Sequence, residues 1–192
     1  MSELDDLFAG LFNADDRLAE SAALSLPQHG QAALERLSRS LKSPDPDRRW
    51  WVVRALAAFD LPEVFPLLIQ ALSDDDHDVV ACALLAMRSR PDVSHVPHLL
   101  PLLSSNINNF SRLAADALIA VGPAAAPILI EYTESPDQPP PSEAVRALAH
   151  LDDYRAVPTL FRLLDSDNPL VEYWAQQGLE NLSIGMAFFS PD

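Results

Sequence analysis

Residues 47–72 read DRRWWVVRALAAFDLPEVFPLLIQAL, which is two apolar helical patterns separated by a short break. In the first pattern, Val52 lies three positions before the pair Ala55-Leu56 and so shares its helical face. The break contains Pro62, and the second pattern carries Pro66 near its start. Proline suits a first helical turn, because its fixed φ is helical and its missing N–H is not needed there. The stretch therefore predicts two helices joined by a short turn.

The same pattern recurs along the chain with a period near 31 residues. A small residue followed by Leu or Met marks each first helix, and a proline marks four of the second helices. The pairs are Ala23-Leu24, Ala55-Leu56, Ala86-Met87, Ala117-Leu118, Ala147-Leu148 and Gly178-Leu179, and the prolines are Pro66, Pro97, Pro127 and Pro158. A single hairpin could not bury its apolar face alone. The two markers therefore predict an all-α protein, an α-solenoid (a superhelical stack) of about six helical hairpins.

The segment from Asp47 to Leu56, followed by Leu61 to Leu68, resembles a HEAT repeat. More narrowly, it is similar to the short repeats called phycobilisome-lyase HEAT-like, and the resemblance extends over roughly residues 12–183. It implies a protein-binding scaffold, with a phycobilin lyase or isomerase-like accessory subunit as the alternative. A HEAT-like DNA glycosylase is a more remote alternative, because that family uses a basic concave face whereas this chain has a net charge of −15. Deoxyhypusine hydroxylase is a HEAT-repeat enzyme that holds iron with His-Glu pairs. This sequence has no His-Glu dipeptide, which argues against that activity.

The chain has 28 acidic and 13 basic residues, a formal net charge of −15. This charge repels nucleic-acid phosphates and fits a basic protein partner.

Cys82 is the only cysteine and lies in an apolar helical stretch, which predicts core packing. His95 and His98 lack an evident third metal ligand, so we expect them on a solvated helix end. No run reaches the roughly 18 apolar residues of a membrane span. We expect a cytoplasmic, non-enzymatic monomer that binds no cofactor, metal, nucleic acid or membrane.

We predict a single repeat domain over residues 1–183, beginning with a capping hairpin at about residues 3–43. Residues 184–192 form a tail, in which we expect Phe188 and Phe189 to fold back over the last repeat. Covering that end would prevent association of a bare apolar surface.

The second helices are the first candidate binding surface. Val64, Leu68 and Leu72 are expected to face the core, which leaves the intervening positions facing the concave side of the stack. In the middle units, these positions hold Gln70, His98, Glu131 and Arg162. We expect them to form a stripe that contacts a partner protein.

Two aromatic pairs are the second candidate surface. Trp50-Trp51 and Tyr173-Trp174 occupy equivalent positions in their repeats. Helical phase directs Trp50 and Tyr173 outward or into the seam between units, and exposed aromatic anchors are typical of interface hot spots.

Acidic residues recur at the turns before first helices, where carboxylates cap free N–H groups. They are Asp15, Asp16, Asp45, Asp47, Asp74, Asp75, Asp76, Asp78, Asp165 and Asp167.

Overall fold

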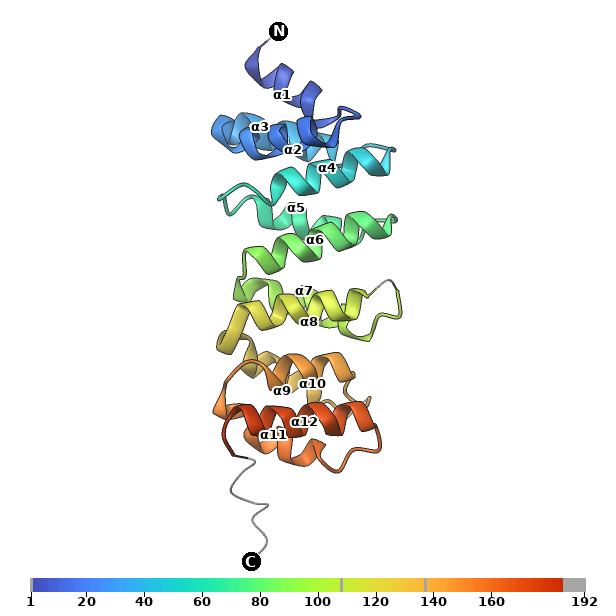
Figure 1. Ribbon diagram of the computed structural model, residues 1–192, viewed down its shortest axis with the longest axis vertical. Helices are drawn as coiled ribbons and strands as arrows, with labels where there is room; N and C mark the ends of the chain where they lie inside the picture. Colours follow the sequence, from blue (N-terminus) through green and yellow to red (C-terminus); the bar gives the residue numbers. More distant parts are fainter. Residues whose placement is uncertain (1, 108, 137, 185–192) are drawn as a thin grey trace, which may run out of the picture. The chain divides into compact units, whose positions relative to one another are not determined.

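The computed structural model describes residues 2–107, 109–136 and 138–184, and its regular structure in these ranges is helical throughout (Figure 1). The chain divides into two compact units, Met1–Arg90 and Pro91–Asp192, and each is described by itself. The prediction of one domain over residues 1–183 stays a prediction. The predicted docking of Phe188 and Phe189 lies outside the described residues.

The first unit contains six α-helices and one 3-10 helix among its described residues. They are α1 (Glu3–Leu11), α2 (Asp16–Ser25), η1 (Leu26–His29), α3 (Gly30–Ser40), α4 (Pro46–Leu56), α5 (Val64–Ala71) and α6 (His77–Ser89). Helix α1 lies within the predicted capping segment, about residues 3–43, but is a third helix in addition to the two of a hairpin; a reciprocal capping box between Ser2 and Asp5 starts it. Within the unit, α4 packs against both α2 and α6.

The second unit continues the alternation of first and second helices. Its elements are η2 (Val93–His95), α7 (Val96–Leu99), η3 (Leu100–Ser104), α8 (Phe110–Val121), η4 (Gly122–Ala125), α9 (Ala126–Thr133), α10 (Ser142–Ala149), η5 (Tyr154–Ala156), α11 (Val157–Leu163) and α12 (Pro169–Asn181). The helix that contains Pro97 changes to 3-10 geometry at η3, because Pro101 has no N–H to continue the α-helical ladder. In this unit α10 packs against α8 and α12.

The small-residue pairs lie in the core, as predicted. Ala55, Leu56, Ala117 and Leu118 are all 0–1% exposed. Leu24 is the exception at 54% exposed, because the buried pair of α2 is Ala22-Ala23, one residue earlier. The predicted prolines lie in the first turns of α5, α7, α9 and α11.

Phe110–Thr133 is long and apolar enough to cross a membrane by length and composition alone, with a mean hydropathy of 1.9. The structure divides this stretch into α8, η4 and α9. Gly122 adopts a φ of 74°, a conformation that ends the first helix before the chain enters the second. The stretch is therefore the apolar pattern of one repeat, and the expectation of no membrane partner stays a prediction.

Polar side chains start most of the first helices. Asp15, Asp45, Asp76 and Asn168 each accept a hydrogen bond from a backbone N–H of the helix that follows. The predicted capping role of the acidic turns is thus confirmed for three aspartates, whereas at α12 the cap is Asn168 rather than Asp165 or Asp167.

Asp74 has a different role. Its carboxylate accepts two hydrogen bonds from Arg49, at 2.7 and 2.8 Å, and both side chains are largely buried, at 10% and 14% exposed. This bidentate pair joins α4 to the turn before α6. Asp74 is therefore a structural residue and is not available to attract a partner.

Gly178→Ala should destabilise the second unit. A Cβ on Gly178 would lie 2.9 Å from the Cα of Ala149 on α10, so α12 could not keep its place. Overpacking costs about 1–3 kcal/mol and exceeds the helix-propensity gain of about 1 kcal/mol. We expect a net loss that is measurable by urea unfolding. Gln176→Ala, at an exposed position of α12, should stay within about 0.5 kcal/mol of wild type. Equal stability of the two variants would contradict this packing.

Asp74→Asn should cost about 1–3 kcal/mol at neutral pH, because it removes a charged hydrogen-bond acceptor from Arg49. Arg49 holds the pKa of Asp74 below its ordinary value of 3.8. The pair therefore contributes stability above pH 3.8, and the contribution is lost as pH falls through the lowered pKa. In urea unfolding at a series of pH values, the difference from wild type should persist at pH 5 and shrink below pH 3.8. Asp75→Asn, at an exposed neighbour, should behave like wild type; an equal loss there would contradict the assignment.

Candidate binding surface

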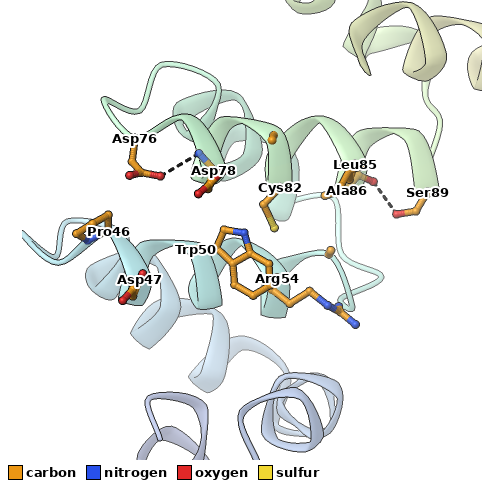
Figure 2. A pocket seen from close by; sticks show the side chains of 12 residues that line it. Pro46, Asp47, Trp50, Arg54, Asp76, Asp78, Cys82, Leu85, Ala86 and Ser89 are labelled. Carbon is orange, nitrogen blue, oxygen red and sulfur yellow. Dashed lines mark hydrogen bonds between the residues drawn. The ribbon is translucent and has the colours of Figure 1, made fainter. Parts of the chain in front are cut away.

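A groove of about 730 Å³ lies between α4 and α6 in the first unit (Figure 2). Trp50 extends from α4 toward Cys82 of α6 and occupies the middle of the groove (Figure 2). Leu85, on α6, is 48% exposed and adds an aliphatic surface beside it. We call this feature the Trp50 groove; its lining residues also include Ala57, Ala81, Ala86, Asp47, Asp76, Asp78, Arg54 and Ser89.

Small side chains line the groove on both helices. Ala57, the C-cap residue of α4, and Ala81 on α6 are among them, and neither fills the space as Leu or Ile would. Cys82 is 7% exposed, and burial raises the pKa of its thiol to about 12. The thiol is therefore neutral at pH 7, so Cys82 is a small apolar residue, as predicted, and a poor nucleophile.

The two ends of the groove differ in charge (Figure 2). Asp47, Asp76 and Asp78 lie at one end, and none of the three is in an ion pair with another described residue. Arg54 lies at the other end, where it pairs with Glu20 of α2. One end is therefore negative, while the cation at the opposite end is already neutralised.

Trp50 also lines a second groove, of about 720 Å³, on the α2 side of α4. We call it the α2–α4 groove; it is also lined by Phe12, Asn13, Ala14, Asp16, Glu20, Asp45, Asp47, Arg48 and Trp51. The Trp50 and Trp51 rings meet edge to face, with centroids 4.8 Å apart, and both side chains are half-buried. Trp50 is thus held in place by its neighbour and separates two adjoining depressions.

Tyr173 and Trp174 repeat this arrangement in the second unit. Their rings also meet edge to face, with centroids 4.9 Å apart, and Trp174 contacts the ring of His150 at 5.6 Å. Tyr173 is 50% exposed. The equivalence of the two aromatic pairs, inferred from their positions in the repeat, is therefore seen in their local geometry.

The predicted stripe residues are all exposed but belong to different surroundings. Gln70, on α5 of the first unit, lines a separate groove with Arg49 and Asp74. His98, Glu131 and Arg162 lie on α7, α9 and α11 of the second unit. Their joint role as one partner-binding stripe stays a prediction.

The environment of Arg162 includes a residue that the sequence argument missed. Arg162 pairs with Glu134, just after α9, and not with Glu131. Thr159 donates a hydrogen bond to the same carboxylate. Glu134 lies three positions after Glu131, so helical spacing offered the only signal for its place.

His95 differs from its predicted place on a solvated helix end. It is 5% exposed, whereas His98 is exposed. Burial lowers the pKa of His95 below its ordinary value of 6.5, although the attraction of Asp92 acts in the opposite direction. The lowered pKa favours the neutral imidazole at pH 7. In the part of the chain that the structure describes, no three His, Cys, Asp or Glu residues are placed to share a metal ion.

Comparison with known proteins shows the family. The HEAT repeats model matches residues 4–88 and 126–186. No curated protein is significantly similar in sequence. Among solved structures, the complex of CpcE and CpcF of phycocyanin lyase from Nostoc sp. PCC7120 is 21% identical, with a TM-score of 0.54, over 95% of this chain and 77% of that one. An engineered protein is 25% identical, with a TM-score of 0.46, over 96% of this chain and 98% of that one.

The family match covers well over half of the chain, and the CpcE–CpcF likeness agrees with it in fold. The predicted all-α repeat solenoid and the resemblance to HEAT repeats are therefore confirmed, and the chain belongs to the HEAT-repeat family.

Proposed function

We propose that the chain is a non-enzymatic scaffold that binds a partner protein, with the Trp50 groove as its principal contact. One observation carries the proposal: a half-buried tryptophan stands between two adjoining grooves in a surface that also exposes Leu85. Interface hot spots are enriched in tryptophan, and they lie in pockets that a partner can fill and desolvate. The proposal includes a monomeric, cytoplasmic chain.

The second helices are the alternative contact surface within the same proposal. Gln70, His98, Glu131 and Arg162 are exposed there, and Glu131 lines a groove of about 740 Å³ in the second unit. Arg162 is already paired with Glu134, so a partner would have to replace that contact. A surface of mixed polar residues supplies less apolar contact area than the Trp50 groove, which is why we place the principal contact at Trp50.

A phycobilin lyase-like accessory subunit is the second candidate function. The CpcE–CpcF likeness motivates it, but at 21% identity the likeness concerns the fold. The two functions differ in a simple observable, the absorption spectrum of the protein prepared in the presence of a bilin. The scaffold proposal expects no bilin absorption to co-purify with the chain, and stable co-purification would favour the accessory subunit.

Trp50→Ala should abolish capture of the partner. The experiment is an affinity pull-down from native lysate, with mass spectrometry to identify the bound protein and calorimetry on the purified pair. Loss of a central tryptophan anchor costs about 2 kcal/mol or more, which is roughly 30-fold in Kd. Trp50 is only half-buried, so the helical signal of the variant should match wild type.

Two matched variants assign the surface. Tyr173→Ala changes the equivalent position of the second unit and should leave Kd unchanged. The quadruple alanine variant at Gln70, His98, Glu131 and Arg162 tests the second helices. Loss of binding in either of these, with wild-type binding in Trp50→Ala, would overturn the placement of the principal contact.

A further inference from the structure

We infer that the segment which occupies the Trp50 groove is basic, and that it places an aliphatic side chain against Trp50 and Leu85 and Lys or Arg residues against Asp47, Asp76 and Asp78. The inference rests on the proposed function and specifies the chemistry of the partner. A mainly basic groove of the first unit provides a direct contrast.

The apolar part of the contact follows from the floor of the groove. Trp50 and Leu85 present aromatic and aliphatic surfaces, and the other apolar residues of the two helices in the lining, Ala57, Ala81, Cys82 and Ala86, are small and leave space beside them. A Leu, Ile or Met side chain matches the size and polarity of that space, whereas a charged side chain would be desolvated there without a partner.

The charged part follows from the lining of both grooves around Trp50. Six carboxylate residues line them, against two guanidinium groups, which leaves four negative charges. The acidic residues are Asp16, Glu20, Asp45, Asp47, Asp76 and Asp78, and the basic ones are Arg48 and Arg54. Arg54 is paired with Glu20, and the Arg48 guanidinium lies 4.4 Å from the centre of the Phe12 ring. Neither of these cations is in an ion pair with Asp47, Asp76 or Asp78, and Arg49, which also attracts Asp76, is already paired with Asp74.

Another groove of the first unit has the opposite charge. It is about 710 Å³ and is lined by Arg36, Arg39, Lys42 and Arg48, with Asp5 as its one acidic residue. Grooves of one unit thus differ in the balance of their lining charges, although Arg48 lines both this groove and the α2–α4 groove. The sign of the charge around Trp50 is therefore a local property and does not simply follow the net charge of −15.

The charges should act on both the rate and the selectivity of binding. Like charges across an interface are costly, and opposite charges speed encounter at low salt. An acidic segment would meet uncompensated carboxylates at the Trp50 groove, while a basic segment would find partners for them. The geometry thus selects the basic one.

The test uses two fluorescein-labelled peptides, GLLGKKKG and GLLGEEEG, titrated with the full chain and followed by fluorescence anisotropy. We expect the Lys peptide to bind at least about tenfold more tightly than the Glu peptide, with a preference that falls as salt is raised. Trp50→Ala should weaken binding of the Lys peptide about tenfold, since it removes the apolar contact.

Matched variants separate the groove from general acidity. Asp47→Asn with Asp78→Asn should weaken binding of the Lys peptide about five- to tenfold. Asp165→Asn with Asp167→Asn removes the same charge from an exposed turn of the second unit and should change Kd less than about twofold. Leu85→Ala should weaken binding, while Leu170→Ala, at a more exposed leucine on α12, should not. Urea unfolding of each variant confirms that it folds.

Three results would overturn the inference: no binding of the Lys peptide, equal binding of both peptides, or equal effects of the two aspartate pairs. If the captured partner protein still binds in a Trp50-dependent manner in those cases, the proposed function stands and only the basic occupant fails. If capture does not depend on Trp50, the proposed function fails first.

Discussion

Close approach of neighbouring first helices is the constraint on which the other features depend. At α10 and α12 it is most severe, because Gly178 lies so near Ala149 that even a methyl group would clash. Ala83, Ala114 and Ala144 are fully buried, and their small side chains allow close approach of helices elsewhere. Small side chains let backbones pack closely, and the larger Leu, Val and Phe residues fill the remaining core. This packing compensates for the inability of any one hairpin to bury its apolar face.

The same use of small residues shapes the candidate binding surface. Ala57, Ala81 and Cys82 are small residues in the lining of the groove between α4 and α6 (Figure 2). Trp50 partly fills that groove and gives it an aromatic wall. The Arg49–Asp74 and Arg54–Glu20 pairs use up cations and tie neighbouring helices of the first unit together. Both cations are therefore already paired, whereas Asp47, Asp76 and Asp78 form no ion pair with another described residue.

Periodic features of the fold were predictable from sequence, and pairwise ones were not. The small-residue pairs recur in every repeat and the prolines in four of them, so their common register predicted the helices and much of the core. Helix α1 lies outside that register, and Leu24 departs from it by one residue. The Arg49–Asp74 pair joins residues 25 positions apart in one orientation of two long side chains, which no local pattern specifies.

The candidate site was predictable in the same partial sense. Trp50 stands out in sequence as an aromatic residue at a repeat position that Ala81 fills in the next unit. The groove beside it depends on small residues of two different helices, and its charge depends on which cations are already paired. His95 shows that spacing can also mislead. Its spacing from His98 predicted that both are exposed, whereas the fold buries His95.

The most direct test of the account is the NMR spectrum of the tryptophan indole N–H groups during titration with the captured partner. The chain has three tryptophans, so each indole signal can be assigned with a single Trp→Phe variant. The account predicts that the signal of Trp50 shifts or broadens on binding, with a smaller effect at its neighbour Trp51, while that of Trp174 stays in place. A shift at Trp174 with no change at Trp50 would contradict it.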